Sequence, residues 1–86
     1  MVSLEVIIAV FRKFMRNASK LEGKELKQGE MEKISRNIDA LKELLEDKGY
    51  IDQAKKLTTF NVSLFKKRKI EEPELKLLRE ILAKIK

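Results

Sequence analysis

The feature that most constrains the fold is a row of five apolar residues within residues 30–49. Spaced alternately by three and four positions, the row consists of Met31, Ile34, Ile38, Leu41 and Leu45. Because an α-helix turns once in about 3.6 residues, this spacing puts all five side chains on one narrow stripe. Such a stripe is typical of a helix that packs lengthwise against another helix. The sequence therefore predicts a central helix at 30–49 around which the rest of the chain packs.

The N-terminal segment, residues 1–23, is predicted to form an amphipathic helix that begins after Ser3 and ends near Gly23. Serine is a favoured N-cap, and glycine readily adopts the left-handed conformation just past a helix end. The apolar side of this helix carries Leu4, Ile7, Ile8, Phe11, Phe14, Met15, Ala18 and Leu21. Val6 and Val10 widen that side beyond the usual apolar arc of roughly 100°. We therefore expect this helix to lie centrally in a bundle or to expose one flank to a second chain.

Residues 50–70 are predicted to form two short helices. Asp52 can cap the first of them, and the β-branched pair at positions 58–59 is expected to interrupt it, because such residues lose rotamer freedom in a helix. Asn61 or Ser63 can begin the second helix.

The last helix is predicted at residues 73–86, with Pro73 in its first turn. Proline has no backbone N–H, and the N–H groups of the first turn have no partner within the helix, so proline costs no hydrogen bond there. A second apolar stripe with the same spacing contains Leu75, Leu78, Leu82 and Ile85. Only three glycines and one proline are present, which leaves little material for many short strands. The expected fold class is all-α, with one domain spanning residues 1–86 and forming a small antiparallel bundle of four to five helices.

The absence of two residue types excludes several kinds of chemistry. The chain contains no cysteine and no histidine, so it can form no disulfide, thiolate nucleophile, Cys/His zinc site or Ser-His-Asp triad. Its carboxylates are not accompanied by a glycine-rich loop or by a metal-ligand spacing. We therefore predict a non-enzymatic protein with no catalytic residue, no metal site and no cofactor.

Composition and hydropathy also indicate the cellular location of the protein and the type of organism it comes from. Charged residues make up 40% of the chain and are mostly Lys and Glu, a bias that thermophile proteins share. The apolar run at residues 6–11 is too short to span a bilayer, and no basic segment precedes it. We expect a cytoplasmic protein of thermophile type that has no membrane as a partner.

Positive charge is concentrated in residues 50–70. The whole chain carries +6, and this segment holds six basic residues against one acid, Asp52, for a local charge of +5. The basic residues are Lys55, Lys56, Lys66, Lys67, Arg68 and Lys69. Cations of this kind neutralise phosphates and release condensed counterions, which favours binding to nucleic acid. A lysine-rich face can also serve only to keep a small protein soluble, and this alternative stays open.

Polar residues between the basic clusters extend the predicted site. Thr59, Asn61 and Ser63 carry hydroxyl and amide groups that can bond to phosphate oxygens or base edges. The polar side of the N-terminal helix supplies a secondary basic face that consists of Arg12, Lys13, Arg16 and Lys20. A membrane surface is an alternative partner for that face, but the narrow apolar stripes later in the chain favour packing against protein.

Three pieces of the chain after residue 40 carry a family resemblance. They are LKELLEDKGY (41–50), QAKKL (53–57) and KIEEPELKLLREIL (69–82), and together they resemble helix-turn-helix DNA-binding domains of phage-repressor type. In that family one helix crosses the DNA backbone, the next enters the major groove, and a proline-led helix closes the domain. The resemblance implies that Ala54 lies where the first two helices cross. It also implies that the helix that enters the major groove carries, on it or near it, Ser63, Lys66, Lys67 and Lys69. Residues 1–23 would then form an N-terminal helical arm.

The leading hypothesis is a nucleic-acid-binding protein that uses residues 55–69, with DNA favoured over RNA and the N-terminal helix as a homodimer contact. Its basis is the +5 segment together with the broad apolar side of that helix. The alternative is a small helical adaptor or subunit that docks on a protein partner, or self-associates, through its apolar helix faces.

Overall fold

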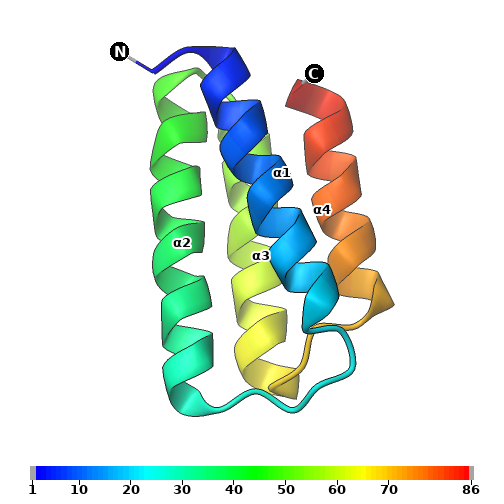
Figure 1. Cartoon of the computed structure of the whole chain (residues 1–86). Helices are drawn as coiled ribbons and strands as arrows, with labels where there is room; N and C mark the ends of the chain where they lie inside the picture. The colour runs from blue at the N-terminus through cyan, green and yellow to red at the C-terminus, as the bar shows by residue number, and fades with distance from the viewer. Residues whose placement is uncertain (1, 86) are drawn as a thin grey trace.

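Four antiparallel α-helices make up the structure, a computed structural model that describes residues 2–85. The helices are α1 (Leu4–Lys20), α2 (Gln28–Asp47), α3 (Ile51–Lys67) and α4 (Glu72–Ile85). They run alternately up and down, so that the α1–α2 and α3–α4 connections share one end of the bundle (Figure 1). The prediction of an all-α bundle is confirmed, with four helices and no strand within residues 2–85. Residues 1 and 86, the outer ends of the predicted domain, lie outside the described residues.

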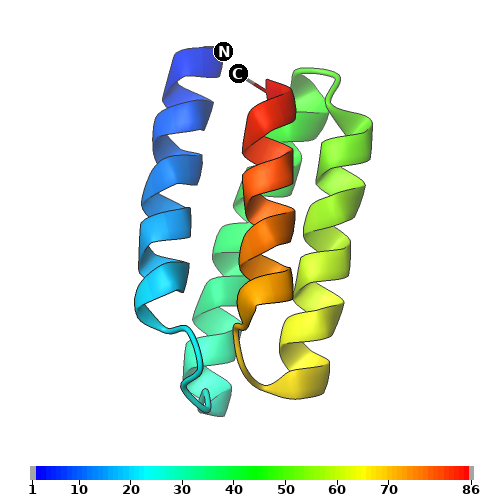
Figure 2. The ribbon, with the colours of Figure 1, turned by 90° about the vertical axis from the view of Figure 1, so that its right-hand side faces the viewer.

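The four helices form a ring in which each contacts two neighbours. α2 packs against α1 and α3, and α4 packs against α3 and α1, so α1 and α3 lie on a diagonal. Figure 2 shows α4 in front, between α1 and α3. The two diagonal helices meet only through side chains in the core, where the rings of Phe14 and Phe60 make an edge-on contact with centroids 5.9 Å apart.

The core is formed by the predicted stripes. All five residues of the α2 stripe are buried, from Leu45 at 0% exposed to Ile34 at 9%. In α4, the residues Leu75, Leu78 and Ile85 are buried and Leu82 is half-buried. These stripes close the bundle because each apolar side chain removed from water contributes roughly 1.5–3 kcal/mol.

Four helix ends lie at or near the residues that the sequence predicts. The Ser3 hydroxyl oxygen accepts a hydrogen bond of 3.3 Å from the Val6 N–H, which makes Ser3 the N-cap of α1. Gly49 directly follows Lys48, the C-cap residue of α2, and has φ of 86°. Gly23 lies two residues after Leu21, the C-cap residue of α1, and has φ of 77°. Both angles lie in the left-handed region that glycine adopts without strain. Pro73 lies in the first turn of α4, as expected.

The prediction of two short helices within residues 50–70 is wrong, because α3 is one continuous helix from Ile51 to Lys67. The two threonines fit into it by donating their hydroxyls to the preceding turn, Thr58 to the carbonyl of Ala54 at 3.5 Å and Thr59 to that of Lys55 at 3.4 Å. Core packing by the buried residues of this helix outweighs the weak helix propensity of the pair. The helix-turn-helix detail is therefore not confirmed.

The ends of α3 also differ from expectation. Tyr50 occupies the N-cap position, and Asp52 lies in the first turn instead, where its charge favours the positive helix end. Asn61 and Ser63 begin no helix and lie in the interior of α3. The helix ends at Arg68, which has φ of 59° and donates its N–H to the carbonyl of Leu64 at 2.7 Å.

The two connections at the lower end of Figure 1 are bonded to each other. The Gly23 N–H donates to the carbonyl of Ile70 at 2.8 Å, and the Leu26 N–H donates to that of Arg68 at 2.9 Å. Leu26 is also buried, at 2% exposed. These contacts hold the basic end of α3 beside the α1–α2 loop.

Candidate nucleic-acid interface

The outward side of α3 brings together three of the predicted site residues. An α-helix advances about 100° per residue, so Lys55, Thr59 and Lys66 lie within roughly 40° of one another around the axis. All three side chains are exposed. They form a line along the helix that points away from the core.

A second set of predicted residues lies on the flank of α3 that faces α4. Ser63 donates its hydroxyl to Oε2 of Glu74 at 2.6 Å, and Lys67 donates its ammonium group to the same oxygen at 2.9 Å. Lys67 also lies 3.5 Å from the Glu71 carboxylate. Ser63 and Lys67 therefore bind Glu74 of α4, a contact that the sequence did not indicate.

Glu74 is the acceptor at the centre of this contact and is only 3% exposed. Its other oxygen, Oε1, accepts the N–H of Glu71 at 2.8 Å, so the same side chain also closes the first turn of α4. Burial alone raises the pKa of the Glu74 carboxyl, but the hydrogen bonds from Ser63, Lys67 and Glu71 outweigh burial and lower that pKa below its ordinary value. The hydrogen bond to Glu74 in turn raises the pKa of Lys67.

Asn61 lies apart from the other predicted site residues. It is about 160° around α3 from Ser63, on the flank that packs against α2. Its side-chain oxygen is buried and accepts no hydrogen bond. The structure therefore places Asn61 inside the α2–α3 contact, away from the outward line of α3.

The basic residues at the end of α3 lie next to cations that sequence reasoning missed. Arg68 is exposed and Lys69 is half-buried in the α3–α4 turn. The hydrogen bonds of Gly23 and Leu26 bring the α1–α2 loop, with exposed Lys24 and Lys27, against this turn. No local signal could have found these two lysines, because they are more than 40 positions away in the chain. The same loop also carries Glu22 and Glu25, which reduce its net charge.

Most cations of the predicted site are free of ion pairs. Within residues 2–85 the ion pairs are Lys67 with Glu71, Lys67 with Glu74, and Arg79 with Glu72. Six residues of the predicted site take part in none of these ion pairs and lie on the outward or α4 side of α3 or in the turn after it. They are Lys55, Lys56, Thr59, Lys66, Arg68 and Lys69. We call these six residues the α3 strip.

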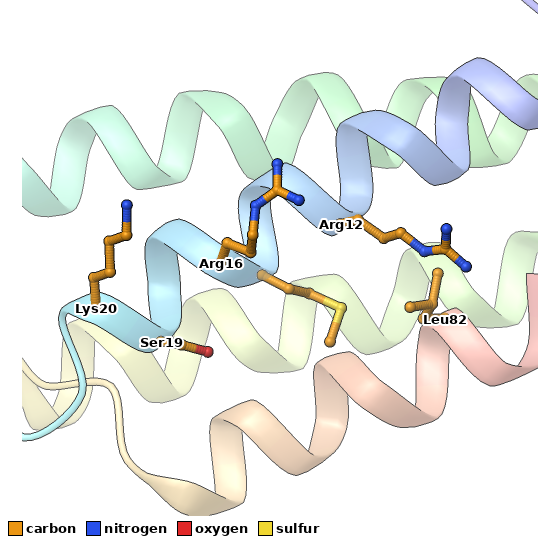
Figure 3. A pocket seen from close by; sticks show the side chains of 6 residues that line it. Arg12, Arg16, Ser19, Lys20 and Leu82 are labelled. Carbon is orange, nitrogen blue, oxygen red and sulfur yellow. The ribbon is translucent and has the colours of Figure 1, made fainter.

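The secondary basic face is divided between two grooves. Arg12, Arg16 and Lys20 line a groove of about 470 Å³ between α1 and α4, together with Met15, Ser19 and Leu82 (Figure 3). Lys13 lines a different groove, between α1 and α2. Because α1 and α3 are diagonal in the bundle, α4 separates the first group from the α3 strip. The two basic faces therefore form no single surface.

Other kinds of site find no support in the described part of the chain. Residues 2–85 contain no group of three acidic side chains arranged to hold a metal ion. None of the four helices is long and apolar enough to cross a membrane. Comparisons with protein-family models, with curated proteins and with solved structures give no significant match for this chain. No relative therefore supplies a function or a set of functional residues.

Proposed function

We propose that this protein binds nucleic acid through the α3 strip, with duplex DNA as the preferred partner. The observation that carries the proposal is that five cations lie on one side and one end of a single helix without ion pairs inside the bundle. Lys55 and Lys66 are eleven residues apart, which corresponds to about 16 Å along the helix axis. Cations spread over this length can contact several phosphates of one strand at once.

The shape of α3 suits this role. An α-helix with its side chains is about 10–12 Å wide, which matches the roughly 12 Å width of the major groove. Thr59 lies between the lysines on the exposed line and carries a hydroxyl that can bond to a base edge or a phosphate. The lysines supply affinity that is independent of sequence, and Thr59 is the residue of the strip best placed for base contacts.

Salt dependence provides the test. Five phosphate contacts predict that the logarithm of the binding constant falls with the logarithm of the salt concentration with a slope of about −4.5. The measurement is fluorescence anisotropy of a labelled duplex titrated with the full chain between 50 and 200 mM salt. The absence of binding at low salt, or a slope near zero, would refute the proposal.

A matched pair of variants localises the contact. In Lys55→Gln/Lys66→Gln/Lys69→Gln, the slope should become less steep by about 0.9 for each lysine removed. The control, Arg12→Gln/Arg16→Gln/Lys84→Gln, removes the same charge from exposed positions on α1 and α4 and should leave the slope close to the wild-type value. Equal losses in both variants would show that net charge alone, and not the α3 strip, attracts the DNA.

A second candidate function is docking on an acidic protein surface through the same helix. Apolar side chains beside the α3 strip favour it: Val62 is 64% exposed, Ile51 47% and Phe65 38%. Exposed apolar groups rimmed by charge are typical of protein contacts. Val62→Ser should leave DNA affinity within about twofold, because phosphates gain little from a valine. A large loss of DNA affinity in this variant would contradict the phosphate-based account.

A further inference from the structure

The groove between α1 and α4 has an apolar floor and a basic rim. The floor consists of Met15 and Leu82, which are both half-buried and packed against the core. The rim consists of Arg12, Arg16 and Lys20, which are exposed and spaced by four residues along α1. In Figure 3, the side chain of Arg12 extends beside Leu82, and those of Arg16 and Lys20 rise on the outer side of α1. The groove therefore offers a partner an apolar contact and a row of positive charges.

The positive charge of this rim is not neutralised by α1. Residues 6–21 contain four basic residues and no acidic one, although the chain has 14 acidic residues in all. None of the three rim cations takes part in an ion pair within residues 2–85. The helix therefore presents an uninterrupted basic row beside the apolar floor.

The acids of α4 do not neutralise the rim either. Glu72 is paired with Arg79, and the buried Glu74 accepts hydrogen bonds from α3. Glu80 lies about 160° from Leu82 around the helix axis, on the side of α4 away from the groove. The rim is therefore complementary to negative charge that is supplied by another molecule.

The apolar floor distinguishes among anionic partners. A phosphate backbone has no apolar group to place on Met15 and Leu82, and a flat bilayer surface does not reach a floor that lies below charged side chains. An amphipathic helix meets both requirements, because its apolar side chains enter the groove while its acidic side chains stay at the rim. Glutamates four residues apart on such a helix repeat about every 6 Å along the axis, as do the three rim cations.

We propose that the α1–α4 groove binds an acidic amphipathic helix of another protein. The helix lies lengthwise between α1 and α4, with apolar side chains on Met15 and Leu82 and carboxylates along the basic rim. A guanidinium group can bind a carboxylate through two parallel hydrogen bonds, so Arg12 and Arg16 fix the register of the partner. Because α1 and α3 are diagonal in the bundle, this site is separate from the α3 strip and does not depend on nucleic-acid binding.

A synthetic peptide provides the test. The probe is a fluorescein-labelled, alanine-based helical peptide with three glutamates spaced by four residues and a neighbouring row of leucines. Fluorescence anisotropy with the full chain should give a dissociation constant in the micromolar range. Replacing the leucines of the peptide with serine should weaken binding at least about tenfold, because the floor then has no apolar partner. The absence of peptide binding at millimolar chain, or equal binding of the serine peptide, would overturn the proposal.

Two matched variants localise the contact. Arg12→Gln/Arg16→Gln/Lys20→Gln should weaken binding of the peptide about tenfold, since it removes three charge pairs at the rim. Lys55→Gln/Lys66→Gln/Lys69→Gln removes the same charge from the α3 strip and should change the affinity by less than about twofold. Circular dichroism checks that both variants remain folded. Equal losses in the two variants, or a loss only in the second, would place the peptide elsewhere and overturn the proposal.

Competition separates the helical partner from other anions. Unlabelled duplex DNA should not displace the peptide, because the α3 strip lies on the diagonal helix. Vesicles of phosphatidylcholine and phosphatidylglycerol in equal parts should not displace it either. Displacement by the duplex would show that one surface binds both ligands, and displacement by the vesicles would assign the groove to an anionic membrane. Either result would overturn the assignment of a separate site for an acidic helix.

Discussion

The Glu74 contact allows a quantitative prediction about the junction between α3 and α4. Glu74→Gln keeps the size of the side chain but replaces one acceptor oxygen with an NH2 group, which cannot accept a hydrogen bond. The wild-type carboxylate accepts the Ser63 hydroxyl at one oxygen and the Glu71 N–H at the other. The variant can therefore satisfy only one of these two donors.

The expected cost follows from that lost partner. A hydrogen bond to a charged group contributes roughly 1.5–3 kcal/mol to stability, and a neutral amide gives less than a carboxylate at the bond that remains. The relief of the buried charge offsets part of the loss. We expect Glu74→Gln to lower the free energy of unfolding by about 2 kcal/mol, measured by urea unfolding followed by circular dichroism at pH 7.

The pH dependence of this difference provides the sharper test. The pKa of Glu74 is lower in the folded protein than its ordinary value near 4.5. The unfolded chain therefore takes up a proton first, so the contribution of Glu74 is fully present above pH 4.5 and is lost as the pH falls through the lower folded pKa. The stability gap between wild type and Glu74→Gln should narrow as the pH falls below 4.5.

A control variant identifies the result that would refute this reasoning. Glu72→Gln removes a carboxylate from the same turn, but its partner is Arg79 at the surface, so the change should stay within about 0.5 kcal/mol. If Glu74→Gln costs no more than Glu72→Gln, or if its cost persists unchanged at pH 3, the buried carboxylate does not hold α3 and α4 together.

Further predictions concern the core, the threonine pair and a helix end. Leu41→Ala should cost about 3 kcal/mol in urea unfolding, because Leu41 is 1% exposed in the α2 stripe and its removal leaves a cavity. Thr59→Ala should raise the stability by about 0.5 kcal/mol, since the exposed position gains helix propensity, and a loss would contradict this. Gly49→Ala should lower the melting temperature with a cost of about 1 kcal/mol, because φ of 86° strains alanine although space for its methyl group is open.

The stripes of α2 and α4 could be predicted because the spacing of apolar residues along a helix indicates which side of it is buried. The interruption expected at residues 58–59 did not occur, because the packing of Leu57, Phe60 and Leu64 fixes α3 more strongly than local propensity loosens it. Propensity is read from neighbours in the chain, whereas burial depends on the other helices. The continuous helix could therefore not be predicted from the sequence of this segment alone.

In the candidate site, too, some features could be predicted from the sequence and others depend on contacts between helices. The excess of positive charge on residues 50–70 is visible in the composition, and the structure keeps most of it on the outward side of α3 or in the turn that follows. The sequence did not indicate that Ser63 and Lys67 bind Glu74, because the residues come together only when α3 and α4 fold back on each other.

The bonded loops at one end of the bundle make two backbone amides useful as reporters of folding. The N–H groups of Gly23 and Leu26 find their acceptors, Ile70 and Arg68, only on the other helical hairpin. A hairpin made of α1 and α2 alone leaves both amides open to exchange with solvent. Their protection against deuterium uptake therefore measures how often the two halves of the bundle come apart, independently of whether each hairpin keeps its own helices.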